Sequence, residues 1–311
     1  MTKQDITARS FIVFGALRSG TTLLRMMLNG HPRLSCPGEM DFIVDHLDPS
    51  GRYDRQALEE SRIYRAHEAL YPETPLADPT PEGFVSRVAG PDDGIAAVIM
   101  HRHLDRALEV FPGMRVLHLM RDPRDVARSS IGMGWAGNVY YGVDHWIGTQ
   151  KDWQRSLDRL PEPQRLVVFY EDLIQKSEET LSGICQFAGL SFHPDMLAYD
   201  ADSTYSKPDP RLILQWKQKQ TPREVGLVEG KIGPMLQQSG YPPSGHPLVH
   251  PGLLDRLGLW LQNKRAQWAW RIERHGLVDP VLVRIASRTG LPGLGRAAKK
   301  RMDNRKIHHL K

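Results

Sequence analysis

The chain has 311 residues, 40% hydrophobic and 25% charged, which is typical of a globular protein with a sizeable core. No apolar stretch approaches the roughly 20 residues that span a bilayer, and the first residues lack the pattern of a signal peptide. Two cysteines, Cys36 and Cys185, give no disulfide framework, so we expect a reducing, cytoplasmic location.

The first motif is a glycine-containing loop between a strand and a helix. Residues 11–15 predict a buried strand, and a helical pattern runs over 21–30. This layout binds anions through backbone N–H groups and the helix N-terminus. A nucleoside triphosphate loop has Lys directly after the second glycine, where this chain has Thr21. The cation here is Arg18, before Gly20, so we do not expect an ATP γ-phosphate.

A second strand and helix offer another anion site. Residues 115–120 predict a strand and 123–131 a helix, with Arg121 where the strand ends and Ser129 two turns into the helix. A forked guanidinium matches phosphate oxygens, and a hydroxyl adds a neutral donor. An ordinary parallel strand followed by an ordinary helix is the alternative interpretation.

The loop sequence Arg-Ser-Gly-Thr-Thr over 18–22 resembles the 5′-phosphosulfate loop of sulfotransferases, which use 3′-phosphoadenosine 5′-phosphosulfate (PAPS) as donor. Arg121 with Ser129 is similar to the 3′-phosphate site of that family, and 169–173 is similar to its segment near the adenine. The resemblance implies in-line transfer of a sulfuryl group from PAPS to a hydroxyl or amine acceptor. It implies these donor-binding residues: Arg18, Ser19, Gly20, Thr21, Thr22, Arg121, Ser129, Tyr170 and Lys207.

Two residues compete for the role of general base. Glu39 lies where tyrosylprotein-type sulfotransferases and many bacterial relatives carry a catalytic Glu. His103 resembles the catalytic His of a Lys-Thr-His-Leu segment in cytosolic sulfotransferases, but His101 or Arg102 replaces that Lys. We favour Glu39 and expect closure over acceptor and donor to desolvate it partly and to raise its pKa toward the working pH. Arg18 would be catalytic as well, because its charge would stabilise the leaving phosphate.

Strands that alternate with helices predict an α/β fold, a P-loop-like parallel sheet in three layers with helices on both faces. Ligands of such sheets bind beyond the carboxyl ends of the strands, where both donor motifs fall. Further strands are expected at 96–100 and 165–169. Helices are expected at 54–71, 103–110, 143–159, 177–188 and 223–240, a Pro-rich connection at 72–93 and a long loop at 191–222. Lys207 and Trp216 fall in that loop and resemble a late family segment that folds over the donor.

The predicted sulfotransferase domain spans 1–245, and a basic helical C-terminal extension spans 246–311. The extension is amphipathic, so it can pack on the core, on another subunit of a homo-oligomer or on a membrane surface. The net charge is +5, and basic residues gather in 294–311. That tail can contact anionic lipid weakly, and a solvated helix end is the alternative.

The sequence has no zinc-ligand spacing and no basic repeat with interleaved aromatic residues, so we expect no metal and no nucleic-acid partner. The sequence does not determine whether the acceptor is a small molecule, a carbohydrate or a peptide. Animal Golgi members of the family carry a membrane anchor, and this sequence has no apolar stretch of that length. We therefore expect a bacterial enzyme. Two other functions stay open, an ATP-dependent P-loop kinase and a non-catalytic nucleotide-binding module. Arg121 and Ser129 argue against the kinase, since this pair has no role in ATP binding.

Overall fold

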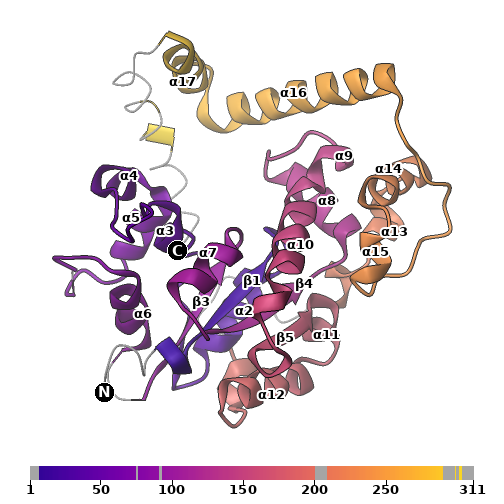
Figure 1. The fold of residues 1–311 in the computed structure, drawn as a ribbon. Helices are drawn as coiled ribbons and strands as arrows, with labels where there is room; N and C mark the ends of the chain where they lie inside the picture. The colour runs from indigo at the N-terminus through magenta and orange to yellow at the C-terminus, as the bar shows by residue number, and fades with distance from the viewer. Residues whose placement is uncertain are drawn as a thin grey trace. The chain divides into compact units, whose positions relative to one another are not determined.

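The computed structural model describes residues 7–74, 76–90, 93–199 and 209–289, together with 298, 301 and 302. The chain divides into two compact units (Figure 1). The first contains Met1–Val126 and His145–Gln218, and the second contains Ala127–Asp144 and Lys219–Lys311. The domain boundary that we placed between 245 and 246 stays a prediction.

The first unit is built on a parallel sheet of five strands in the order β2-β3-β1-β4-β5. The central strand β1 pairs with β3 on one side and with β4 on the other. The chain therefore reverses its direction of growth at β1, and such reversals open a ligand site beyond the carboxyl ends of the strands. The strands are β1 Phe11–Gly15, β2 Leu34–Ser35, β3 Ile95–Met100, β4 Arg115–Met120 and β5 Arg165–Phe169.

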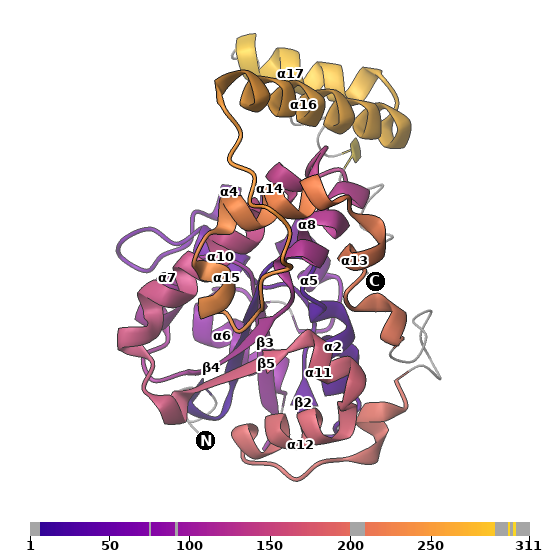
Figure 2. The same ribbon diagram turned by 90° about the vertical axis from the view of Figure 1, so that its right-hand side faces the viewer.

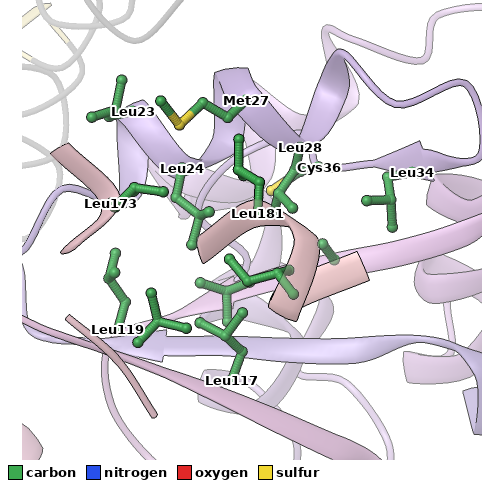
Figure 3. Close-up of a cluster of buried hydrophobic side chains, with 14 of the residues drawn as sticks. Leu23, Leu24, Met27, Leu28, Leu34, Cys36, Leu117, Leu119, Leu173 and Leu181 are labelled. Carbon is green, nitrogen blue, oxygen red and sulfur yellow. The ribbon is translucent and has the colours of Figure 1, made fainter. Parts of the chain in front are cut away.

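Helices cover both faces of this sheet (Figure 2), because both faces of its strands are apolar. Ile12 and Phe14 of β1 point into one hydrophobic core, and Phe11 and Val13 point into the other. The first core also packs α3 Phe42–Asp45, α6 Pro81–Ala89, α7 Leu104–Val110 and α10 Asp144–Ser156. The second packs α2 Thr21–Asn29, α11 Tyr170–Gln175 and α12 Ser177–Ala188 (Figure 3). The predicted three-layer α/β fold is confirmed.

The structure differs from the predicted elements in three places. The expected helix over 223–240 is two helices, α14 Pro222–Ile232 and α15 Met235–Gln238, separated by Gly233 and Pro234. The expected helix over 54–71 is two helices, α4 Arg55–Glu60 and α5 Arg62–Glu68, because Ser61 ends the first and caps the second. The helix α6 lies inside the segment predicted as a Pro-rich connection. Its start signal was present, since the Thr80 side chain accepts a hydrogen bond from the Gly83 N–H and Pro81 occupies the first turn.

The segment 191–222 is mostly irregular, as predicted, within its described part. It contains two short 3₁₀ helices, Pro194–Leu197 and Pro210–Leu212, and the single helical turn α13 Trp216–Lys219. Two more 3₁₀ turns, Leu157–Arg159 and Glu162–Gln164, precede β5. Lys207 lies outside the described residues.

The second unit is helical. It contains most of α8 Pro123–Gly132, and α9 Val139–Gly142, α14 Pro222–Ile232, α15 Met235–Gln238, α16 Leu253–His275 and α17 Val278–Thr289. Within it, α16 is joined to the segment after α8, because the Gly137 N–H donates to Asn263 Oδ1 at 2.6 Å and Asn138 Nδ2 donates to the Leu259 carbonyl at 2.8 Å. The helical character of the C-terminal extension is confirmed for α16 and α17. None of the helices described is both long and apolar enough to cross a membrane.

Candidate active site

The loop after β1 has the shape of an anion site, and two glycines give it that shape. A Cβ on Gly15 would lie 2.7 Å from the Leu119 carbonyl oxygen, so a side chain there would push β1 from β4. Gly20 has a φ of +95° and begins α2, and a Cβ there would lie 2.2 Å from the Tyr170 ring. Only glycine suits both the positive φ and the close approach of the Tyr170 ring. The start of α2 can therefore lie against Tyr170, the residue that follows β5.

The start of α2 is open to an anion. No side chain among the described residues caps this helix, so its first backbone N–H groups keep their capacity to donate. The Ser19 hydroxyl is fully buried and has no hydrogen-bond partner among the described residues. Arg18 adopts a φ of 72°, a conformation uncommon for a residue with a side chain and frequent at binding sites.

Arg121 joins the loop to the ends of β4 and β5. Its Nη1 donates to the Arg18 carbonyl at 2.9 Å, and its Nη2 donates to the Leu212 carbonyl at 2.8 Å. Its guanidinium carbon lies 4.4 Å from the centre of the Tyr170 ring. The structure therefore brings together three of the residues expected to bind the donor. Ser129 lies on α8 in the second unit, so its place near the donor stays a prediction.

A buried ion pair fixes the segment around Trp216 beside this site. Asp122 pairs with Arg124 at 2.6 Å and accepts a hydrogen bond from Trp216 Nε1 at 3.0 Å. The Trp216 backbone N–H donates to Asp125 Oδ1 at 2.8 Å, and the Arg124 guanidinium lies 3.9 Å from the centre of the indole ring. This network was not predicted from the sequence.

Glu39 lies on the other side of the loop. The neighbouring Met40 N–H donates to the Ile99 carbonyl at 2.8 Å, which extends the sheet beside the end of β3. Glu39 Oε1 lies 3.6 Å from His101 Nε2, and His101 Nδ1 lies 2.6 Å from the Gly15 carbonyl oxygen. A short chain of contacts thus connects the Glu39 carboxylate to the first residue of the anion loop.

Charged neighbours determine the electrostatics of Glu39. Burial alone would raise the pKa of Glu39, but the His101 imidazole, helped by Arg62 and Arg102, outweighs burial and lowers that pKa. For His101, burial would lower the pKa, but Glu39 and Asp41 outweigh it and raise the pKa. A rise in the pKa of Glu39 on closure over acceptor and donor stays a prediction, and the partner His101 was not included in the sequence-based expectation.

His103, the alternative base, has different neighbours. Just over half of its side chain is exposed, its Nε2 lies 3.8 Å from Asp45 Oδ1, and its N–H donates to Asp152 Oδ2 at 2.9 Å. The Arg102 guanidinium pairs with Asp45 and lies 3.8 Å from Asp41 Oδ1. That His101 or Arg102 takes the place of the Lys in the Lys-Thr-His-Leu segment stays a prediction.

A parallel sheet whose central strand leads through such a loop into a helix defines a class of α/β enzymes that bind phosphate-bearing substrates. A profile of the sulfotransferase family matches residues 10–194, more than half of the chain, and the chain therefore belongs to this family. It is accordingly a transferase. The predicted family and enzyme class are confirmed, and the kinase alternative is not favoured. Within the described ranges, no three His, Cys, Asp or Glu side chains gather as metal ligands would.

Individual relatives agree with this assignment. The chain is 23% identical over 264 residues to protein-tyrosine sulfotransferase 2 of Gallus gallus, covering 75% of this chain and 69% of that protein. It is 22% identical over 282 residues to protein-tyrosine sulfotransferase A of Caenorhabditis elegans, covering 78% and 69%. The fold is similar to the sulfotransferase domain of the Synechococcus PCC 7002 olefin synthase, with a TM-score of 0.59, 23% identity and coverage of 71% of this chain and 93% of that domain.

Proposed function

We propose that this sulfotransferase takes PAPS as donor and transfers the sulfuryl group to a hydroxyl acceptor, with Glu39 as the general base. One observation carries the proposal, namely that the loop after β1 is held between two candidate groups. Arg121 donates to the Arg18 carbonyl on one side, and the contact through His101 connects Gly15 to Glu39 on the other. An acceptor activated by Glu39 would therefore meet a donor bound at the loop.

The donor contacts follow from the chemistry of each group. The 5′-phosphosulfate would lie at the N-terminus of α2, among Arg18, Ser19, Gly20, Thr21 and Thr22, where fixed N–H donors and one cation stabilise charge on the leaving phosphate. Arg121 and Ser129 would bind the 3′-phosphate, Tyr170 would lie near the adenine, and Lys207 would reach a phosphate. A transferring sulfuryl group carries less charge than a phosphoryl group, so this site can act without a metal ion.

The lowered pKa of Glu39 favours an acidic acceptor hydroxyl. A carboxylate with a low pKa is a weak base, and it removes a proton more readily from a phenol, with a pKa of about 10, than from an aliphatic alcohol. Two relatives are named for transfer to protein tyrosine, which has this phenolic group. We therefore propose a phenolic hydroxyl, on a peptide or a small molecule, as the first acceptor class to test.

The donor is tested by thermal shift with 3′-phosphoadenosine 5′-phosphate against ATP with Mg²⁺. A ligand of the folded site should stabilise it by about 2.7 kcal/mol at a hundredfold excess over its Kd. Stabilisation by ATP with Mg²⁺ alone would support the kinase instead. Turnover of sulfuryl-labelled PAPS with a panel of phenols, tyrosine peptides, sugars and amines, with and without chelator, then tests transfer and acceptor class. The absence of turnover with every acceptor would support a binding module.

We also propose that the enzyme works in the cytoplasm of a bacterium. Both cysteines are free and buried, which suits a reducing compartment. Most of the basic segment 294–311 lies outside the described residues, so weak membrane contact and homo-oligomer formation stay predictions. Lipid co-sedimentation and the molar mass in solution test them.

A further inference from the structure

His101 is a buried residue held by contacts on four sides. Its backbone N–H donates to Asp41 Oδ1 at 2.8 Å, and its carbonyl oxygen lies 3.2 Å from Thr149 Oγ1. Its ring nitrogens face the Gly15 carbonyl oxygen at 2.6 Å and Glu39 Oε1 at 3.6 Å. Only 3% of the His101 side chain is exposed, against 33% for Glu39. The imidazole is therefore fixed in place, and Glu39 is the member of the pair that an acceptor can reach.

These neighbours determine where the protons of His101 lie. A carbonyl oxygen only accepts hydrogen bonds, so the Nδ1 that faces Gly15 must carry a proton. In a neutral imidazole, Nε2 would then present a lone pair to the Glu39 carboxylate, and the two would repel each other. The close approach is favourable when a proton lies between Nε2 and the carboxylate. The Arg62 and Arg102 charges favour the ionised carboxylate, which makes His101 an imidazolium.

We propose that His101 is a positioning residue for Glu39, an imidazolium that ties the carboxylate of the general base to the carbonyl end of β1 and keeps it ionised. This inference rests on the proposed function of Glu39. In the reaction, the acceptor hydroxyl proton passes to Glu39 while the acceptor oxygen attacks the sulfur. The bond from the sulfur to the 5′-phosphate oxygen of PAPS breaks, 3′-phosphoadenosine 5′-phosphate leaves, and His101 keeps both of its protons. Both ring nitrogens of His101 face protein atoms, so the side chain acts through Glu39.

The surrounding charges set the pH dependence of the pair. Glu39 faces His101, Arg62 and Arg102, and all three favour its ionised form against the effect of burial. His101 faces Glu39 and Asp41, and Asp41 in turn faces Arg102 and Asp45. Without the His101 charge, burial would act on Glu39 with less opposition and its pKa would rise. As the solution is acidified, Glu39 would then become protonated at a higher pH than in the wild type, and activity would be lost at that higher pH.

The first test compares pH profiles of kcat/KM for the acceptor in the wild type and in His101→Gln. We expect the acid limb to move to higher pH, so that the ratio of wild-type to variant activity near pH 5.5 exceeds the ratio near pH 8 by about tenfold. The matched control is His118→Gln, another buried histidine, which bonds to Phe14 and Gln150 and has no contact with Glu39. Its acid limb should stay in place even where its stability falls.

The second test does not depend on turnover or on a variant of His101. In protein labelled with ¹⁵N in its histidines, the His101 ring should show a proton on Nδ1 and titrate above the ordinary range, and in Glu39→Gln its pKa should fall. An unmoved acid limb in a folded His101→Gln, or identical His101 titrations in the wild type and Glu39→Gln, would overturn the inference. A coupled titration in a protein that sulfates no acceptor would support the pairing while removing the proposed function.

Discussion

Asp122 and Asp41 are both fully buried carboxylates, and they lie on opposite sides of the central strand β1, Asp122 after β4 and Asp41 after the bridge from Glu39 to β3. Both oxygens of Asp122 have partners, since Oδ1 accepts from the Arg124 N–H and Nε, and Oδ2 accepts from Arg124 Nη2 and Trp216 Nε1. Asp41 differs, because Oδ1 accepts from the His101 and Arg102 N–H groups while Oδ2 has no partner among the described residues.

The difference separates a structural cluster from a candidate catalytic one. A buried charge whose hydrogen bonds are complete holds segments together, and here it holds the Trp216 segment to the end of β4. A cluster with incomplete hydrogen bonds and opposed pKa shifts is typical of a site that handles protons. Glu39 and His101 belong to the second cluster, where the pKa of the acid is lowered and that of the base is raised.

The largest expected effect is on chemistry, in Glu39→Gln. The amide keeps the shape of the side chain but cannot accept the acceptor proton, so kcat should fall by about 10²–10⁴-fold while donor affinity persists. The measurement is steady-state turnover together with calorimetric binding of 3′-phosphoadenosine 5′-phosphate. His103→Asn in the same assay should cost much less. Near-normal turnover of Glu39→Gln beside an inactive, folded His103→Asn would transfer the role of base to His103.

The next effect is on stability, in Asp122→Asn. This change removes the negative charge that pairs with the buried Arg124 guanidinium, which should lower the free energy of unfolding by about 3–5 kcal/mol. Urea unfolding of the wild type and the variant measures it. A loss below about 1 kcal/mol would show that the cluster around Asp122 does not hold the fold together.

The strands and the anion loop could be predicted because their signals are local. The apolar runs of β1, β3, β4 and β5 are continuous in sequence, and the loop residues 16–20 directly follow β1. The helix α6 was missed although Thr80 and Pro81 mark its start, because the surrounding prolines were interpreted as a connection. That miss was avoidable, since a capping residue before proline is itself a local signal.

The coupling of Glu39 to His101 could not be predicted in the same way. It depends on the register in which Phe14 pairs with Met100, which places Gly15 beside His101, and on the single bridge from Glu39 to Ile99. Contacts of this kind are set by packing between distant segments. A histidine directly after a buried strand was the only local hint.

A smaller effect is expected for donor binding in Arg121→Ala. The 3′-phosphate is remote from the reacting sulfur, so the donor KM should rise while kcat changes less, with a loss of about 1.5–3 kcal/mol in binding. Part of the loss would come from the contacts of Arg121 with the Arg18 and Leu212 carbonyls, which also shape the loop. Comparing donors with and without a 3′-phosphate separates the two causes. Unchanged discrimination between these donors would contradict the assignment.

The smallest effect is expected for Asp41→Asn, the counterpart of Asp122→Asn. The Asn oxygen can still accept from the His101 and Arg102 N–H groups, and no buried cation depends on Asp41 alone, since Arg102 also pairs with Asp45. Neutralisation should therefore change the free energy of unfolding by about 1 kcal/mol or less near pH 7.

The sign of its pH dependence follows from burial, which raises the pKa of Asp41 against the pull of His101 and Arg102. The folded state then binds this proton more tightly than the unfolded state, whose aspartate pKa is about 3.9, so ionising Asp41 costs stability as the pH rises above that value. Asn carries no such proton. Relative to the wild type, Asp41→Asn should therefore be more stable near pH 7 than near pH 4, and urea unfolding at both values measures this. A relative stability that falls over this range would mean that the ionised form of Asp41 is the one its neighbours favour.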